Sequence, residues 1–226
     1  MDSRRVVVWA GLVLLCVGRV GAAPQAVPAP VERYILIASH AVVIAPAAPL
    51  LPFPGSQSPI GIARANDTLR VTNQFNGYVA VLTADGGVSW TPAVMLRLTD
   101  DPPEQVVAPG ARVILEAMRF FGMPYEFGGS DHSLDCSLLV QTSFKACGAQ
   151  LPRTAAEQAE VGAPIEVNAL HPGDRLYFSS SGDAIDHTGI YLGAGWFVHA
   201  SASQGKVWAD RLVEAPWRTL FVSARR

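Results

Sequence analysis

The chain is poor in cysteine and in charge. Its 226 residues include three cysteines, and only 16% of them are charged. There is no CxxC or HxxxH spacing of the kind that structural zinc sites use, and no basic tract of the kind that binds nucleic acid. The longest N-terminal apolar run, Val6–Val17, is shorter than the roughly 20 residues that cross a bilayer.

Half of the residues are hydrophobic, which is typical of a globular chain with one or two small domains. Arg4 and Arg5 precede the run Val6–Val17, and the small residues Gly21 and Ala22 follow it. This order predicts a secretory signal peptide, residues 1–22, cut after Ala22. An uncleaved anchor is the alternative. Cleavage changes the formal net charge from −2 to −4, because three arginines and one aspartate are removed. Export places the mature protein in the periplasm or outside the cell.

Two cysteines, Cys136 and Cys147, remain after cleavage. On one helix, eleven residues apart, they are separated by about 16 Å, whereas a disulfide needs Cα atoms within about 7 Å. We therefore predict that both thiols are free, although export favours disulfides in general.

Turn residues and prolines divide the mature chain. Residues 23–33 are rich in proline and alanine and indicate a linker. Residues 34–98 hold short runs of β-forming residues broken by turns such as Asp85-Gly86-Gly87, which predicts a small β-barrel or sandwich. The acidic, proline-containing segment 99–110 is the predicted boundary.

Residues 111–226 have a different pattern. A helix that stops at Gly122 is expected first, with its apolar face made by Val113, Ile114, Ala117, Met118 and Phe121. A second helix is expected from Cys136 to Gly148, and five strand-like runs follow it. Two helices followed by an antiparallel sheet predict an α+β fold.

Cys136 stands at the start of the second helix, between Asp135 and Ser137. Asp135, or Ser133, is a suitable N-cap, and the positive end of the helix dipole favours a thiolate in the first turn. A cysteine nucleophile also needs a base within hydrogen-bond reach. The candidate bases are the chain's histidines, His40, His132, His171, His187 and His199.

His187 and His199 lie in two strand-like runs joined by Gly193-Ala194-Gly195, which predicts a hairpin. If the residue numbers of paired positions add to an even number, both rings point to the same face, about 5–8 Å apart. One imidazole then serves as base and the other orients it, as in serine and cysteine hydrolases. The alternatives are a cysteine that only packs, or three ligands of a zinc ion.

Five blocks between residues 111 and 226 resemble the NlpC-type cell-wall cysteine peptidases, which have a papain-like fold. In order, the blocks are GMPYEFGG, DCS, LPRTAAEQ, LHPGDRLYF and DHTGIYLGAGWFVHAS. The segment upstream, with ANDTLRV and VSWTP, resembles the bacterial Src-homology-3-like barrel that often precedes such domains.

The resemblance implies an enzyme that cleaves the bond between γ-D-glutamate and a diamino acid in peptidoglycan stem peptides. Cys136 is then the nucleophile, His187 the base and His199 the orienting residue. Tyr125 falls where the family places a hydroxyl near the oxyanion or the D-glutamate carboxylate. Asp135 and Ser137 match the Asp-Cys-Ser motif and help to hold the substrate. Neither a metal nor a cofactor is implied.

Two positions depart from the family's pattern. Leu138 replaces the glycine that usually follows Asp-Cys-Ser, and its volume is expected to narrow the cleft. Thr154 and Ala155 replace an Asp-Ser pair that marks members selective for a free L-alanine amine, which predicts action on intact wall. The alternatives are a muramoyl-alanine amidase on the same fold, and a non-catalytic wall-binding protein whose cleft is obstructed by Leu138 or by the barrel.

Overall fold

The computed structural model describes residues 35–36, 40–99, 108–182 and 184–226. The predicted signal peptide, residues 1–22, and the linker, residues 23–33, lie outside these ranges, as does most of the predicted linker 99–110. Within the described residues, no helix is long and apolar enough to cross a membrane.

The upstream region is made of antiparallel strands, as expected. One sheet has the order β7-β6-β5-β2-β8, with β1 also paired to β5. Its strands are β1 (Ile35–Leu36), β2 (His40–Val43), β5 (Thr68–Phe75), β6 (Tyr78–Leu82), β7 (Val88–Pro92) and β8 (Leu96–Leu98). A separate hairpin consists of β3 (Ala47–Leu50) and β4 (Gly61–Arg64).

Local sequence explains the tight turns of this region. Asn76 and Gly77 both have positive φ, at 48° and 79°, and join β5 to β6 in a two-residue hairpin. Asparagine and glycine are the residues that such turns prefer. The predicted turn at Asp85-Gly86-Gly87 joins β6 to β7, and Gly86 has a φ of 82°. In the described pairings β7 and β8 are the ends of an open order, so closure into a barrel stays a prediction.

The second region is α+β, as predicted. Its sheet has the order β13-β12-β11-β10-β14-β9. The strands are β9 (Pro164–Ile165), β10 (Arg175–Phe178), β11 (His187–Gly193), β12 (Trp196–Ser201), β13 (Lys206–Arg211) and β14 (Phe221–Arg225). The helices are α1 (Pro109–Met118), α2 (Cys136–Ala146), α3 (Ala155–Ala159) and α4 (Trp217–Leu220). Two short 3-10 turns, Ala93–Met95 and Val167–Ala169, complete the elements.

The two long helices begin and end at residues that the sequence marks. Pro109 is the first residue of α1, a position where proline's missing N–H does not matter. Helix α1 ends at Met118, and Gly122 follows a further turn with a φ of 85°. Helix α2 ends before Gly148, whose φ is 89°. Both helices pack against β11, and α2 also packs against β12.

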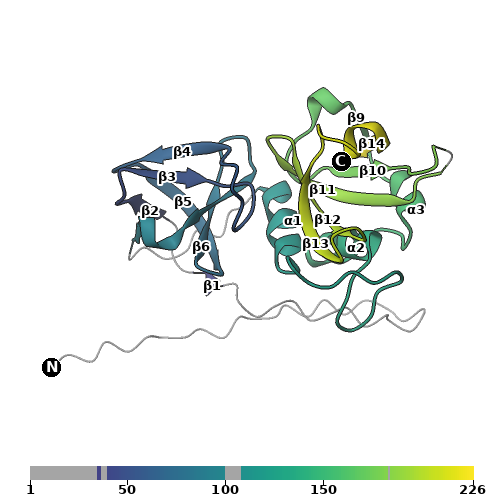
Figure 1. Cartoon of the computed structure of the whole chain (residues 1–226), viewed down its shortest axis with the longest axis horizontal. Coiled ribbons are helices and arrows are strands. Elements are labelled where there is room, and N and C mark those ends of the chain that lie inside the picture. The colour runs from purple at the N-terminus through teal and green to yellow at the C-terminus, as the bar shows by residue number, and fades with distance from the viewer. Residues whose placement is uncertain (1–34, 37–39, 100–107, 183) are drawn as a thin grey trace.

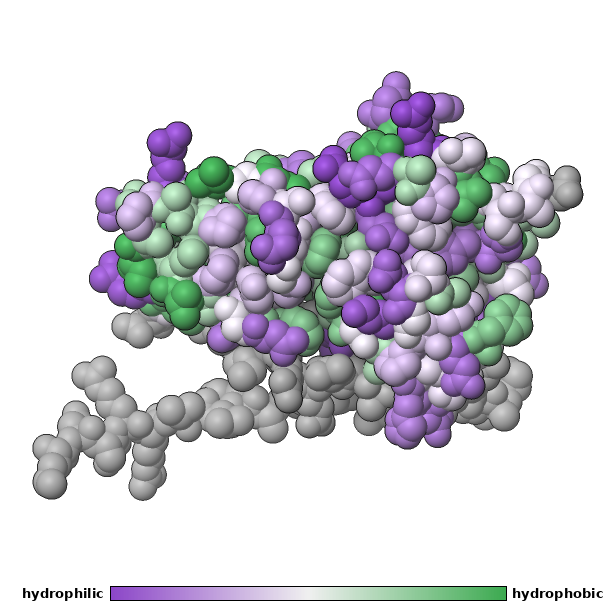
Figure 2. All heavy atoms as spheres, in the orientation of Figure 1, coloured by the Kyte–Doolittle hydropathy of each residue, from purple (hydrophilic) through white to green (hydrophobic). Residues whose placement is uncertain are grey.

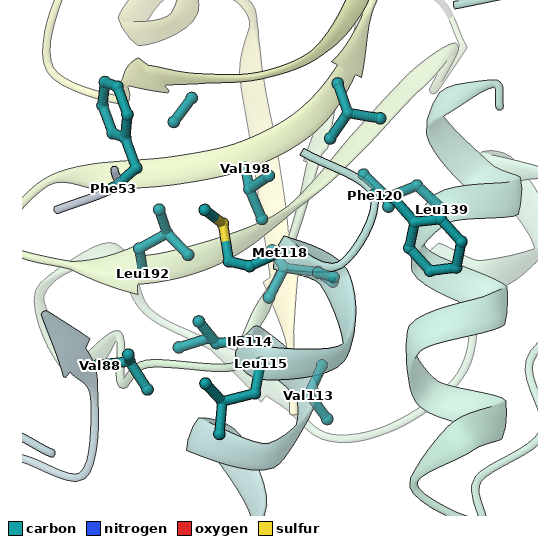
Figure 3. Close-up of a cluster of buried hydrophobic side chains, with 14 of the residues drawn as sticks. Phe53, Val88, Val113, Ile114, Leu115, Met118, Phe120, Leu139, Leu192 and Val198 are labelled. Carbon is teal, nitrogen blue, oxygen red and sulfur yellow. The ribbon is translucent and has the colours of Figure 1, made fainter. Parts of the chain in front are cut away.

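A continuous apolar core joins the two regions. Figure 1 shows α1 between the upstream strands and the second sheet. In Figure 3, Phe53 and Val88 of the upstream region belong to one cluster of buried side chains with Ile114 and Met118 of α1 and Leu192 of β11. The ring of Phe53 lies 5.5 Å from that of Phe121, 5.2 Å from Trp196 and 5.7 Å from Trp208.

The outer surface is mixed in character. Figure 2 shows hydrophilic and hydrophobic residues interspersed over both regions, with apolar groups prominent on the upstream strands. Exposed apolar side chains of the upstream region include Ile44, which follows β2, and Ile62 of β4. Phe53 is one of the buried upstream residues that join the two regions, whereas the side chain of Ile62 stays in solvent.

We expect Phe53→Ala to lower the free energy of unfolding by about 3–5 kcal/mol, the usual range for truncating a buried phenylalanine. Chemical denaturation measures this change. Ile62→Ala is the matched control, since its side chain is 66% exposed, and should change stability by less than about 0.5 kcal/mol. A loss below about 1 kcal/mol for Phe53→Ala would contradict a shared core.

Candidate active site

Helix α2 begins at Cys136 because Asp135 caps it. Asp135 has an extended backbone, with φ −93° and ψ 174°, and its carboxylate accepts a 2.7 Å hydrogen bond from the Leu138 backbone N–H. This satisfies one of the unpaired N–H groups at the helix start. Cys136 is thus the first residue of the helix, as the sequence predicted, and its thiol stays free, like that of Cys147.

The Asp135 carboxylate is also fixed from the side by Arg153. The guanidinium donates to both carboxylate oxygens, at 2.5 and 3.1 Å, and to the Ser137 hydroxyl at 2.9 Å. The Gly128 backbone N–H adds a further bond to the carboxylate at 3.1 Å. Asp135 and Ser137 therefore hold the helix start and the glycine loop together. The sequence analysis singled out both residues but not Arg153, although Arg153 lies within the block LPRTAAEQ.

Cys136 is buried, with 8% of the residue exposed, and its sulfur lies against the start of strand β11. Its Sγ is 4.0 Å from the Asp186 carbonyl oxygen, and the Thr188 backbone also interacts with it. Asp186 and Thr188 flank His187 in the chain. Helix α2 thus brings the sulfur to the point on β11 where the predicted base stands.

His187 and His199 are brought together by the register of the hairpin. Ile190 pairs with Val198, so paired numbers add to an even value, and both rings point to the same face as predicted. The Nε2 atom of His187 is 2.7 Å from Nδ1 of His199, and the two rings are nearly perpendicular. The turn lies at Ala194 and Gly195, both with positive φ.

The surroundings of His199 contain two groups that sequence reasoning missed. His199 is fully buried, and its Nε2 atom lies 3.0 Å from Oδ2 of Asp210 on β13. The indole N–H of Trp217 donates to the same oxygen, also at 3.0 Å. The Trp217 ring stacks on His187 at 5.2 Å between centroids. Asp210 falls inside a strand-like run, but nothing in its local pattern distinguishes it from a solvent-facing strand residue.

Burial dominates the electrostatics of the site. It raises the pKa of the Cys136 thiol to about 11, against the lowering effect of the backbone N–H groups of Thr188, Ser137 and Cys136 itself. It lowers the pKa of His187 to about 3, with help from neighbouring His199. The free site therefore holds a neutral thiol beside a neutral imidazole. Loss of hydration on burial therefore opposes the thiolate that the helix dipole alone favours.

Tyr125 lies near enough to Cys136 and Asp135 to interact with both electrostatically. Burial raises the pKa of its phenol, and the charges of Cys136, once that thiol is ionised, and of the Asp135 carboxylate raise it further. Its backbone is held by Gly205 and by a bridge to Leu134. The hydroxyl is therefore protonated at neutral pH and is able to donate a hydrogen bond.

Leu138 points away from solvent rather than into an open cleft. Its side chain is buried in the main apolar core, against the loop at Gly129. A Cβ atom added to Gly129 would lie 2.5 Å from the Leu138 side chain, so the glycine makes room for this leucine. Leu138 was expected to narrow the cleft, whereas its side chain fills space in the core beside Gly129.

The other three histidines lie apart from the histidine pair. His40 is on β2 of the upstream region, and His132 is in the exposed loop before α2. His171 lines a cavity between the two regions, together with Phe144 of α2. Phe144 is eight residues from Cys136, which is about 12 Å along the helix. Within the described part of the chain, no cluster of three or more His, Cys, Asp or Glu residues is arranged to hold a metal ion.

The site combines a cysteine at a helix start with two hydrogen-bonded imidazoles from adjacent strands, the arrangement of a cysteine hydrolase. The NlpC/P60 family model matches residues 122–226. This part of the chain belongs to the NlpC/P60 family, the cell-wall peptidases that the sequence motifs resemble. The family model does not extend to the upstream strands.

Several named proteins are similar to this chain. The gamma-DL-glutamyl hydrolase of Bacillus subtilis is 44% identical over 58% of this chain and 31% of its own length. The gamma-D-glutamyl-L-lysine dipeptidyl-peptidase of the same species is 31% identical over 67% of this chain and 50% of its own. The murein DD-endopeptidase MepS of Escherichia coli is 36% identical over 51% and 62%. The chain thus spans less than two thirds of these relatives.

Solved structures support the fold. The NlpC/P60 family protein of Bacillus cereus matches 83% of this chain and 62% of its own with a TM-score of 0.50, at 24% identity. NlpC1 of Trichomonas vaginalis matches 84% and 69% with a TM-score of 0.51, at 22% identity. These likenesses extend over both regions of the chain and concern the fold alone.

The raised pKa of Cys136 predicts slow alkylation at neutral pH. In a Cys147→Ala protein without residues 1–22, Cys136 is the single thiol. Its rate of reaction with iodoacetamide is expected to rise steeply up to about pH 11, since the thiol is neutral below that value. An ordinary cysteine is half ionised near pH 8.5. A rate that levels off below pH 7 would instead show a preformed thiolate.

Proposed function

We propose that the chain is an exported cysteine endopeptidase that cleaves the bond between γ-D-glutamate and a diamino acid in peptidoglycan stem peptides. The observation that carries the proposal is the 2.7 Å contact between His187 and His199 beside the start of α2. Cys136 is the nucleophile, His187 the base and His199 the residue that orients it. The layout is the one predicted from the sequence: signal peptide 1–22, linkers 23–33 and 99–110, Src-homology-3-like barrel 34–98 and peptidase domain 111–226.

The neutral resting pair fits a general-base mechanism. The Cys136 proton moves to His187 as Sγ attacks the γ-amide carbonyl carbon, so charge is created only when the substrate is present. The tetrahedral oxyanion accepts hydrogen bonds from the Cys136 backbone N–H and from Tyr125. Donors of this kind contribute about 3–4 kcal/mol each. His187 then protonates the leaving amine, and water hydrolyses the thioester and regenerates the thiol.

The choice of bond rests on the family resemblance and on the names of two relatives. Both Bacillus subtilis relatives are named for the hydrolysis of γ-glutamyl bonds, whereas the Escherichia coli relative is named as a murein DD-endopeptidase and LD-carboxypeptidase. The shared catalytic groups do not distinguish these substrates. A muramoyl-alanine amidase on the same fold is therefore the second candidate.

A non-catalytic wall-binding role has less support. That role would require that Leu138 or the upstream strands obstruct the cleft. Leu138 is buried in the core instead, and the hydrogen-bonded chain from His187 to Asp210 is complete. These contacts favour a working site.

The first test uses a stem tripeptide of L-alanine, γ-D-glutamate and a diamino acid, and purified wall as a second substrate. Mass spectrometry of the products should show L-alanyl-D-glutamate and the free diamino acid. Cys136→Ala, which removes the nucleophile and keeps the buried volume similar, should abolish release. The Cys147→Ala protein is the matched control and should retain activity.

Fragments that all end at the muramic acid would establish the amidase alternative. Release that persists in Cys136→Ala would contradict the mechanism. Binding of wall without any release by the unaltered chain would leave the wall-binding role in its place.

The start of α3 bears on whether a free amine is required. The Thr154 hydroxyl accepts from the Glu157 backbone N–H at 3.3 Å, and the Thr154 backbone N–H donates to the Glu157 carboxylate at 3.2 Å, which forms a capping box. The hydroxyl also donates to that carboxylate at 2.7 Å. Ala155 is buried. Neither position presents a carboxylate to a substrate ammonium, which supports our proposal that muramyl-linked peptides are accepted.

We expect kcat/KM for a muramyl-linked tripeptide to lie within about tenfold of that for the free tripeptide, because a pocket without an ammonium partner gains little from the free amine. Competition between the two substrates, followed by mass spectrometry, measures the ratio. Glu157→Gln is the control, since Glu157 is the acidic side chain in the first turn of α3. Cleavage that strictly requires the free amine would refute this expectation. If that requirement disappears in Glu157→Gln, the Glu157 carboxylate is the group that binds the amine.

A further inference from the structure

The chain of hydrogen bonds at the site does not end at His199. It continues to the Asp210 carboxylate, whose Oδ2 atom is 3.0 Å from His199 Nε2 and 3.0 Å from the indole nitrogen of Trp217. His199 is fully buried, whereas the Asp210 side chain keeps 23% of its surface exposed. One carboxylate oxygen thus collects two N–H donors at the inner end of the site.

The fold places Asp210 there through strand register. In the pairing of β12 with β13, Asp210 lies opposite Phe197, which is two residues from His199 on the same strand face. Diagonal neighbours of this kind are within reach of each other's side chains. Trp217 arrives from α4, where its ring stacks on His187 and meets the edge of His199 at 4.7 Å.

These contacts determine where the ring protons lie. A carboxylate only accepts hydrogen bonds, so His199 must carry its proton on Nε2. Its Nδ1 atom is then an acceptor, and the 2.7 Å contact requires His187 to donate from Nε2. The remaining nitrogen of His187, Nδ1, is left with a lone pair, which is what a general base needs.

We propose that Asp210, assisted by Trp217, is a positioning residue that fixes the tautomers of both histidines and so presents an unprotonated Nδ1 of His187 to Cys136. The proposal rests on the proposed function for its catalytic meaning, whereas the tautomers themselves are a property of the folded protein. Nothing in the reaction consumes Asp210. The thiol proton moves from Sγ to Nδ1 of His187, and Asp210 stays ionised while His199 remains an acceptor toward the resulting imidazolium.

The shared oxygen also explains the role of Trp217. Its N–H donates to Oδ2 and its ring covers His187, so Oδ2 cannot swing away from His199 without breaking a second bond. The carboxylate favours the charged form of His199, acting against burial, which lowers the pKa of that imidazole. Asp210 therefore stabilises positive charge on the histidine pair and also determines which ring nitrogens carry the protons.

The experiment measures tautomers and kinetics in the same proteins. Ring nitrogens labelled with 15N report by NMR which nitrogen is protonated. We expect both His187 and His199 to carry the proton on Nε2 in the unaltered chain. Asp210→Ala should give mixed tautomers and lower kcat about 10- to 100-fold, the usual effect of losing an orienting partner, with KM within about twofold.

Asp210→Asn should restore the tautomers and most of kcat, because its carbonyl oxygen accepts from the same two N–H groups. Glu214→Gln is the matched control: Glu214 is an exposed carboxylate in the following turn, and its loss should change neither readout. If Asp210→Ala does not fold, Asp210→Ser replaces it, since its hydroxyl is one bond shorter and does not span the gap to Nε2.

Unchanged tautomers and kcat in Asp210→Ala, or in Asp210→Ser where it replaces the alanine variant, would overturn the proposal, and so would a loss confined to KM. If the unaltered chain cleaves no stem peptide, the proposed function fails, and the NMR spectra still decide whether Asp210 sets the tautomers.

Discussion

The hydrogen bond between His187 and His199 is the interaction on which the rest of the site depends. It joins two strands whose pairing is set by a short turn with two positive-φ residues, Ala194 and Gly195. A shift of one residue in this register would turn one imidazole to the other face of the sheet. The alternation that packs Val198 and Ala200 against the helices therefore also keeps the two rings together.

Burial gives this site its chemical character. A buried thiol and a buried imidazole both avoid charge, so the resting pair is neutral even though the cysteine stands at a helix start. In the mechanism we propose, charge separates only during attack, when the Asp210 carboxylate stabilises the positive charge on the histidine pair. At the start of α2, Arg153 pairs with the Asp135 carboxylate, which offsets its charge and keeps the helix cap in place.

The shared core connects this chemistry to the upstream strands. Phe53 packs among Phe121, Trp196 and Trp208, and Trp196 lies at the start of the strand that carries His199. The upstream region therefore supports the catalytic sheet directly, rather than being joined to it by a linker alone.

Local signals made much of this predictable from the sequence. Asp135 caps the helix as expected, the glycine turns lie where they were predicted, and the parity of the hairpin brings the two histidines together. Groups that depend on contacts across strands were not predictable. Asp210 is diagonal to His199 across a pairing that no sequence pattern specifies, and Trp217 and Arg153 reach the site from distant segments. The burial of Leu138 was not predictable either, because the space beside Gly129 exists only in the folded loop.

Trapping of the acyl-enzyme tests the central claim most directly. When the protein is mixed with stem peptide and quenched in acid, intact-mass spectrometry should detect a thioester on Cys136 whose added mass equals the L-alanyl-D-glutamyl fragment. His187→Ala should greatly reduce its formation. Rapid turnover that persists in Cys136→Ala, or equal adduct formation in His187→Ala, would contradict a cysteine nucleophile activated by the histidine pair.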